Sequence, residues 1–225
     1  MSEHNSLQAG KNESGYLALP AGAATGAVLV LHAWWGLNEV FTDLCDRLAQ
    51  AGFVAYAPDL NDGKIAATIA EAEALNEARD QERTGAAAFG GLAALRAHPA
   101  AGDGPVGLIG FSMGASWAVE LASAKPEDVA AVVLFYGAGL TDFAPSRAAY
   151  LGHFSETDEW EPMEWVNKME TGMREAGREV TIHLYPDAKH WFFEPNRPEY
   201  DPAFAELAWE RTLAFLRAKL GGQPA

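Results

Sequence analysis

Short, continuous apolar runs recur along the chain, and each predicts a strand that is buried on both faces of a sheet. The clearest runs are AVLVLH at 27–32, FVAYA at 53–57, VGLI at 106–109 and VAAVVLFY at 129–136. Weaker runs predict further strands at 16–19, 149–154 and 180–185. The stretch 16–19 is expected at an edge of the sheet.

Between these runs, apolar residues recur at intervals of three and four, a spacing that predicts helices. The predicted helices cover residues 38–51, 65–97, 115–121, 162–176 and 204–220. Asn38 or Thr42 is a candidate cap for the first helix. Thr84 and Gly85 mark a candidate break in the second.

Strands that alternate with helices of this length predict a parallel sheet. We therefore expect an α/β fold with a mostly parallel central sheet of about six to eight strands, flanked by helices on both faces. No repeat or linker divides the sequence, so residues 1–225 are expected to form a single domain, with 1–14 as a polar N-terminal tail. Ligands of such sheets bind beyond the carboxyl ends of the strands.

The composition restricts the class of partner and the location. A formal net charge of −15 and a pI near 4.7 argue against binding to nucleic acid or to an anionic membrane. The first residues are polar and contain no apolar signal region, and the uncharged stretch 20–38 is interpreted as a loop and a strand. A cytoplasmic protein without a membrane span is expected. The single cysteine, Cys45, rules out an intrachain disulfide and is expected in the core.

The candidate chemistry centres on the stretch PVGLIGFSMGASWAVEL at 105–121. Its segment GFSMG, at 110–114, has the Gly-x-Ser-x-Gly pattern of a nucleophile elbow between a strand and a helix. Glycine suits both flanking positions because a side chain there would collide with the neighbouring strand or helix. Ser112 is the predicted nucleophile. The backbone N–H of Met113, at the start of the helix, is a predicted donor to an oxyanion.

A serine nucleophile needs a base, which is usually a histidine that a carboxylate orients. In this kind of fold the order along the chain is serine, acid, histidine. Of the histidines that follow Ser112, His153 and His183 lie inside predicted strands and are interpreted as packed or surface residues. His190 lies in a loop after the strand 180–185, at the edge where Ser112 is expected. His190 is therefore the predicted general base.

The loop after the strand 149–154 offers several acids to orient that base. They are Glu156, Asp158, Glu159 and Glu161. Asp158 is favoured because it lies just beyond the strand end and before Trp160 and Pro162, where packed structure is expected to resume. The spacing alone leaves Glu156 as an alternative.

Together these residues resemble the dienelactone hydrolase family of the α/β-hydrolase fold. The matching segments are HAWWGLN at 32–38, APDL at 57–60, 106–114, Asp158 with Pro162, His190, and ERTL at 210–213. The resemblance extends from about residue 16 to residue 218. It implies Ser112 as nucleophile, Asp158 as acid and His190 as base. It also implies the backbone N–H of Trp34 as the second oxyanion donor.

The sequence departs from the family pattern around the substrate. Dienelactone hydrolases have a cysteine at the position of Ser112, and at the position of Ala33 a glutamate that controls the ionisation of that thiol. The family's arginine for a substrate carboxylate falls at Glu194, where an anion would repel such a substrate. Arg79 and Arg83 are available for a second substrate arginine but have no assigned place. We therefore expect a substrate other than dienelactone.

Aromatic residues gather at or beyond the predicted strand ends on the side of Ser112. They are Trp34, Trp35, Tyr136, Trp191, Phe192 and Phe193. Of these, Trp35, Tyr136, Trp191 and Phe192 are predicted to line the substrate pocket. Such a lining favours a neutral, partly apolar acyl or alcohol group.

The sequence thus predicts a serine hydrolase that cleaves a carboxylic ester or lactone through an acyl-enzyme. Walker, Rossmann and HExxH patterns are absent, so no cofactor and no metal are expected. The expected partner is a small-molecule substrate, with the chain as a monomer or homodimer. A non-catalytic binding module on the same scaffold, a thioesterase and a peptidase remain alternatives.

Overall fold

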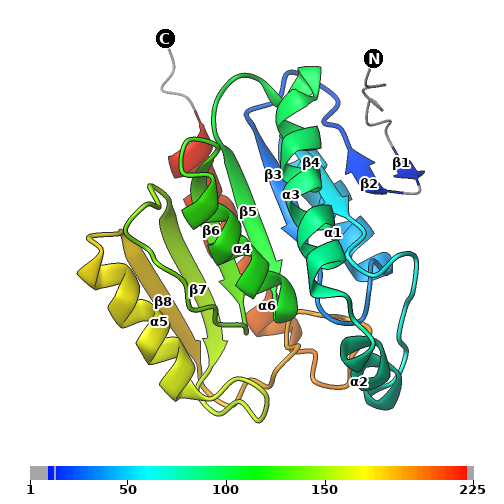
Figure 1. The fold of residues 1–225 in the computed structure, drawn as a ribbon, viewed down its shortest axis with the longest axis vertical. Helices are drawn as coiled ribbons and strands as arrows, with labels where there is room; N and C mark the ends of the chain where they lie inside the picture. Colours follow the sequence, from blue (N-terminus) through cyan, green and yellow to red (C-terminus); the bar gives the residue numbers. More distant parts are fainter. Residues whose placement is uncertain (1–9, 13, 222–225) are drawn as a thin grey trace.

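The computed structural model describes residues 10–12 and 14–221, which form a central sheet with helices on both faces (Figure 1). The sheet has eight strands in the order β1-β2-β4-β3-β5-β6-β7-β8. Their bounds are β1 Gly10–Asn12, β2 Gly15–Ala18, β3 Gly26–Leu31, β4 Phe53–Pro58, β5 Val106–Phe111, β6 Val129–Phe135, β7 Ala149–Ser155 and β8 Val180–Tyr185. Strands β3 to β8 are parallel, and β1 and β2 are antiparallel additions at one edge. The expected mostly parallel α/β sheet is confirmed.

The sheet places its candidate ligand-binding crevice between β3 and β5. The chain runs from β3 to β4 on one side and returns to β5 on the other side, so the strand order reverses at this point. The two strands pair in parallel from Val28 with Gly107 to Leu31 with Gly110. In open α/β sheets, ligands bind at such a reversal, outside the carboxyl ends of the strands. The loops after β3 and β5 therefore flank the expected site.

Helices cover the two faces of the sheet in separate groups. Helices α1 (Glu39–Gln50) and α6 (Pro202–Leu220) pack on one face. Helices α3 (Gln81–Ala97), α4 (Met113–Ala124) and α5 (Met163–Glu175) pack on the other, which faces the viewer in Figure 1. The short helix α2 (Ile69–Glu77) lies near the carboxyl ends of the strands, and a 3-10 turn spans Pro99–Ala101.

The apolar residues of α1 and α6 recur at helical spacing because one side of each helix packs into a shared core. Phe41, from α1, packs against Phe111 at the end of β5, and Phe111 stacks on Phe135 of β6 with ring centroids 4.6 Å apart. Burying an aromatic or aliphatic side chain of this size stabilises the fold by roughly 1.5–3 kcal/mol. Cys45 is fully buried in the same core, as expected, and burial raises the pKa of its thiol.

The N-terminal edge differs from the sequence prediction. Gly10–Asn12 forms β1 and pairs with β2, so the interpretation of 1–14 as a tail is wrong for residues 10–12. Ser14 is also held, since its carbonyl accepts from the Asp59 N–H, whereas residues 1–9 and 13 lie outside the described residues. The sequence predicts that residues 16–19 form the edge strand. The edge strand is instead β1, and β2 is the second strand of the sheet.

The long helical stretch 65–97 breaks earlier than expected. Helix α2 ends at Glu77, and α3 begins after Asp80, whose side chain accepts a hydrogen bond from the Arg83 N–H. Gly85 lies inside α3, where its lack of a side chain has a packing role. A Cβ at this position would lie 3.0 Å from the Trp117 ring of α4. The sequence signal at Gly85 thus marked a close contact between helices, not a helix end.

None of the helices in the described part of the chain is long and apolar enough to cross a membrane.

Candidate active site

Ser112 occupies a strained turn between β5 and α4. Its φ is +48° and its ψ is −114°, a conformation that costs a non-glycine residue about 1–3 kcal/mol. Its N–H donates to the Phe135 carbonyl of the next strand, which holds the turn against the sheet. A Cβ at Gly114 would lie 2.1 Å from the Leu31 carbonyl oxygen, so this glycine allows the turn to approach β3 closely. The strain holds the Ser112 hydroxyl beyond the end of the sheet.

Three side chains form a continuous line of hydrogen bonds at this edge. The His190 Nε2 lies 3.1 Å from the Ser112 Oγ, and the His190 Nδ1 lies 2.8 Å from the Asp158 Oδ2. The Asp158 and His190 side chains are only 2% and 4% exposed. Because a carboxylate can only accept, the His190 Nδ1 carries the proton and Nε2 is free to accept from the serine hydroxyl. This is the arrangement that activates a serine nucleophile.

The loops that carry the acid and the base are anchored to each other. Asp158 accepts hydrogen bonds from the backbone N–H groups of Trp160 and Glu161, which fix the direction of its carboxylate. The Ser155 hydroxyl, at the end of β7, donates to the Ala188 carbonyl at 2.7 Å and joins the loop after β7 to the loop after β8. The distance between the acid and the base is therefore set by the fold.

The peptide between Ala33 and Trp34 is oriented by His32, which the sequence did not single out. The His32 Nε2 accepts from the Leu60 N–H at 3.0 Å, so its Nδ1 carries the proton and donates to the Ala33 carbonyl at 2.7 Å. The Gly36 N–H donates to the same carbonyl. Burial lowers the pKa of His32 to about 4, which keeps the ring neutral in this tautomer. With its carbonyl held this way, the peptide presents the Trp34 N–H on its opposite side.

The second predicted oxyanion donor lies in the first turn of α4. Met113 is the first residue of that helix, and the N–H groups of a first turn have no acceptor within the helix. The helix dipole adds a favourable field for negative charge at the same place. The turn thus supplies a donor beside the Ser112 hydroxyl.

Four tryptophans form a cluster over the catalytic side chains: Trp34, Trp35, Trp160 and Trp191. Trp191 lies edge-on to the His190 ring at 4.9 Å between centroids, and Trp160 contacts both Trp34 and Trp191. The indole N–H groups of Trp34, Trp35 and Trp191 are buried without a hydrogen-bond partner among the described residues. The cluster shields the line of hydrogen bonds from water on this side.

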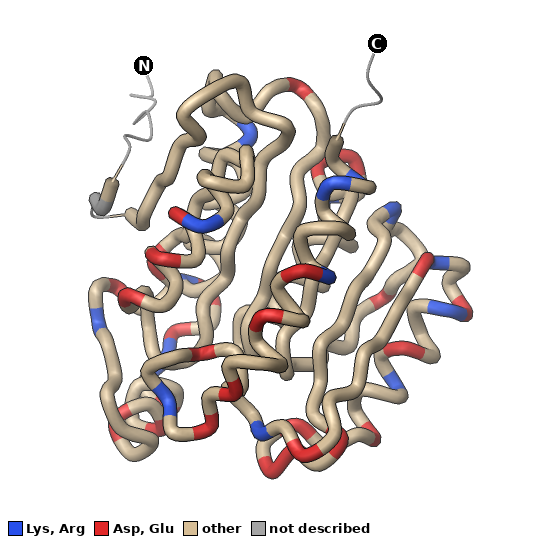
Figure 2. Tube along the Cα trace, turned by 180° about the vertical axis from the view of Figure 1, so that it is seen from behind, with Lys and Arg blue, Asp and Glu red and all other residues tan. Residues whose placement is uncertain are grey.

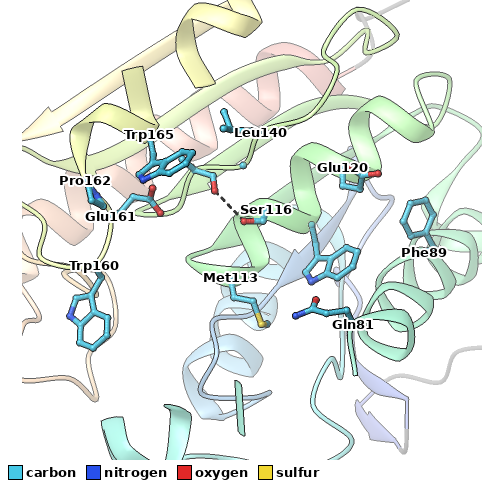
Figure 3. Close-up of a pocket in the computed structure, with 13 residues that line it drawn as sticks. Gln81, Phe89, Met113, Ser116, Glu120, Leu140, Trp160, Glu161, Pro162 and Trp165 are labelled. Carbon is cyan, nitrogen blue, oxygen red and sulfur yellow. Dashed lines mark hydrogen bonds between the residues drawn. The ribbon is translucent and has the colours of Figure 1, made fainter. Parts of the chain in front are cut away.

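A cavity of about 870 Å³ opens beside Met113, the residue after Ser112, and its lining differs from the predicted pocket (Figure 3). Trp35, Tyr136, Trp191 and Phe192 are buried and none of them lines it. The aromatic wall comes instead from Phe89, Trp117, Trp160 and Trp165. The sequence prediction selected aromatics at strand ends, whereas the cavity lies between α3, α4 and the start of α5.

Glu194, which the sequence suggested as an anion facing the substrate, lies inside the protein. It is fully buried, and its Oε1 accepts from the Tyr136 hydroxyl at 2.7 Å. Its Oε2 is buried without a hydrogen-bond partner among the described residues. Burial raises the pKa of Glu194 to about 8. Glu194 therefore supports Tyr136, which packs against the His190 ring at 4.9 Å, and it does not line the cavity.

The remaining candidates lie away from the nucleophile. The His153 ring is buried and hydrogen-bonds the Tyr185 and Thr212 hydroxyls, and His183 stacks on it. Arg79 donates to the Asn61 side chain, whose amide in turn donates to the Trp34 carbonyl. Arg83 forms an ion pair with Asp62. Neither arginine lines the cavity.

The Glu156 alternative is not supported by geometry, because both described contacts of the His190 Nδ1 with a carboxylate are to Asp158. No group of three or more His, Cys, Asp or Glu side chains in the described ranges is placed to hold a metal ion.

Comparison with known proteins gives consistent results. The model of the dienelactone hydrolase family matches residues 14–220. A protein of Azospirillum brasilense, provisionally named a carboxymethylenebutenolidase, is 31% identical over 225 residues, covering 92% of this chain and 94% of the relative. The protein usf of Aquifex pyrophilus is 30% identical over 216 residues and covers 92% and 93% of the two chains.

Among solved structures, the fold is similar to that of a dienelactone hydrolase-like promiscuous phosphotriesterase from metagenomic libraries. The TM-score is 0.82 at 22% sequence identity, over 92% of each chain.

Proposed function

Because this chain belongs to the dienelactone hydrolase family, whose members act on ester bonds, we propose that it cleaves a carboxylic ester or lactone through an acyl-enzyme on Ser112. The observation that carries the proposal is the line of hydrogen bonds from Ser112 through His190 to Asp158. The substrate carries no carboxylate beside the reacting carbonyl, because the cavity lining includes Glu120 and Glu161 but no lysine or arginine.

In the first half of the reaction, His190 takes the proton from Ser112 as the hydroxyl oxygen attacks the carbonyl carbon. Asp158 stabilises the imidazolium that forms. The N–H groups of Met113 and Trp34 donate to the oxyanion of the tetrahedral intermediate, and each such donor typically contributes roughly 100- to 1000-fold in rate. His190 then protonates the leaving alcohol, and the acyl group remains on Ser112.

In the second half, a water molecule enters where the alcohol has left. His190 accepts a proton from that water, which attacks the acyl-enzyme carbonyl, and the same two amides stabilise the second oxyanion. Collapse of the intermediate returns the proton to Ser112 and releases the acid. No step requires a cofactor.

The variant Ser112→Ala tests the nucleophile. We expect the turnover of 4-nitrophenyl butyrate to fall by at least about 10⁴-fold while the circular dichroism spectrum stays unchanged. His190→Gln is expected to lose activity similarly, whereas the matched control His183→Gln keeps it, because the His183 ring stacks on His153 and the hydrogen bonds from Ser112 to Asp158 run through His190. Full activity in Ser112→Ala would rule out the mechanism.

A fluorophosphonate probe separates this proposal from the non-catalytic alternative. An activated serine reacts readily with such a probe, so mass spectrometry should find the adduct on Ser112 in the parent protein and lose it in His190→Gln. Absence of the adduct in the parent protein would favour a binding module. Matched thioester and amide substrates then rank the hydrolase alternatives. The cytoplasmic location and the monomeric or dimeric state remain predictions from the sequence.

A further inference from the structure

The cavity is lined by residues that are next to Ser112 in the chain or that hydrogen-bond Asp158. Met113, the residue after Ser112, lies in the cavity wall. Trp160 lies there too, and its backbone N–H donates to the Asp158 carboxylate. Figure 3 shows Met113 and Ser116 of α4 on one side, with Trp160, Glu161 and Trp165 across from them. A substrate held at Ser112 would extend one of its groups into this space. The cavity wall therefore determines which group that is.

Aromatic rings form much of that wall. They belong to Phe89, Trp117, Trp160 and Trp165. Trp160 and Trp165 are 42% and 48% exposed, so their indoles are presented to the cavity and to solvent instead of filling the core. The face of an indole ring carries negative electrostatic potential and attracts cations within about 6 Å. The Lys168 ammonium, which does not line the cavity, lies 5.3 Å from the centroid of the Trp165 ring.

Two carboxyl groups complete the wall. Glu161 is partly buried just before α5, where the Ala138 N–H donates to it, and burial raises its pKa to about 7. Glu120, on α4, accepts from the Thr141 hydroxyl. Neither carboxyl group is in an ion pair within the described residues, and the cavity lining contains no lysine, arginine or histidine.

The surrounding surface has the same sign. In Figure 2, acidic segments gather along the edge of the molecule where the parallel strands end. The loop after β7 supplies Glu156, Glu159 and Glu161 there, within a chain of net charge −15. A field of this sign raises the local concentration of cations near the site and lowers that of anions.

We propose that this cavity binds an ammonium group, so that the preferred substrate is an ester with a quaternary or primary ammonium on its acyl or alcohol part. The faces of the aromatic rings contact the cation, and the Glu161 carboxylate supplies the opposite charge. This inference rests on the proposed ester hydrolysis and deepens it by naming the class of substrate. The carboxylates of Glu161 and Glu120 would repel a carboxylate on the substrate.

The test compares esters of equal shape that differ only in charge. The acyl pair is 4-nitrophenyl 4-(trimethylammonio)butyrate and its uncharged isostere, 4-nitrophenyl 5,5-dimethylhexanoate. The alcohol pair is choline butyrate and 3,3-dimethylbutyl butyrate. At pH 8 and low salt, we expect kcat/KM for the cationic ester to exceed that of its isostere by about tenfold in at least one pair. The preference should shrink as salt screens the charges.

Variants assign the preference to the cavity. Glu161→Gln should reduce the charge preference, measured as the ratio of kcat/KM for the cationic and the neutral ester of one pair, to about one- to threefold. Trp165→Leu should reduce it in the same direction. The control Glu164→Gln removes an exposed carboxylate on the same helix that does not line the cavity, and it should keep the full preference.

The outcomes separate the two proposals. Equal kcat/KM for the cationic and neutral esters within both pairs would overturn the ammonium site. A preference for the cationic ester that survives Glu161→Gln would overturn it as well. Both results would leave the proposal of ester hydrolysis intact. If no ester is turned over and the fluorophosphonate does not label Ser112, the hydrolase proposal fails. In that case calorimetry with choline and its uncharged isostere 3,3-dimethylbutanol still tests the cavity. Binding of the cation no tighter than that of the alcohol would refute it.

Discussion

At the scale of the single residue, His32 links two loops through its ring. It accepts from the Leu60 N–H and donates to the carbonyl of the peptide that carries the Trp34 N–H. Removing the ring leaves that carbonyl with the Gly36 N–H alone and lets the peptide rotate. We infer that His32 is a positioning residue for the oxyanion and that it has no contact with the substrate.

The variants His32→Asn and His32→Gln test this role. The asparagine amide can replace the Nδ1 donor, whereas the glutamine reaches the position of Nε2. We expect His32→Gln to lower kcat by about 10- to 100-fold with little change in KM, because the lost interaction acts in the transition state. His32→Asn should retain more of kcat. Equal loss in both variants, or a loss confined to KM, would contradict the positioning role.

The sequence could point to Ser112 and His190 because each follows a predicted strand, and strand ends of a parallel sheet meet at one edge. The same argument left Asp158 and Glu156 open, and the resemblance to the family favoured Asp158. The sequence could not identify Glu161 or Glu194. Glu161 is one of four acids between 156 and 161, and nothing local separates a half-buried carboxyl group from its solvated neighbours. The burial of Glu194 depends on Tyr136, which is 58 residues away.

At the scale of the element, caps decided the helix boundaries that apolar spacing left open. Asp80 caps α3 by accepting from the Arg83 N–H, and its carbonyl receives the Thr84 hydroxyl. Thr68 and Glu71 form a capping box at the start of α2. Residues 65–97 are rich in the helix formers Ala, Glu, Leu and Arg, so helix propensity predicted one helix where the caps create two. The buried strands were easier to predict because continuous apolar runs have few alternative interpretations.

The Asp80→Ala variant tests the cap of α3. We expect the free energy of unfolding to fall by about 1 kcal/mol, because the first turn of the helix loses a side-chain acceptor. Asp80→Asn, which caps similarly, should remain within a few tenths of that of the parent protein. Urea unfolding followed by circular dichroism measures both. A change of the same size in the two variants would point to the charge of Asp80 instead of its hydrogen bond.

At the scale of the whole molecule, opposing sets of buried titratable groups shape the pH dependence of stability. Burial lowers the pKa values of His32 and His153, so the fold loses stability as the pH falls below about 6.5, where the unfolded chain gains protons. Burial raises the pKa values of Glu161 and Glu194. Their contribution is complete below about pH 4.5 and is lost as the pH rises through about 7 and 8 respectively.

The histidines are common to the parent protein and to a variant of Glu194, so their contribution cancels in the difference between the two unfolding free energies. The Glu194 carboxyl binds its proton more tightly in the folded state throughout the window between pH 6.5 and 8. The parent protein should therefore lose stability relative to Glu194→Gln, which keeps an acceptor for the Tyr136 hydroxyl and cannot ionise. The difference between the two unfolding free energies is expected to change by about 2 kcal/mol across the window. Urea unfolding at pH 6.5, 7.2 and 8 measures it.

The control for this experiment is Glu164→Gln, which removes an exposed carboxylate and should run parallel to the parent protein. Parallel curves for Glu194→Gln and the parent protein would mean that Glu194 is already ionised at pH 6.5. The buried Oε2 would then carry negative charge without a partner, an arrangement that is costly beside the Tyr136 and His190 rings. A neutral Glu194 avoids that cost and keeps a second charge away from the imidazolium that forms during catalysis.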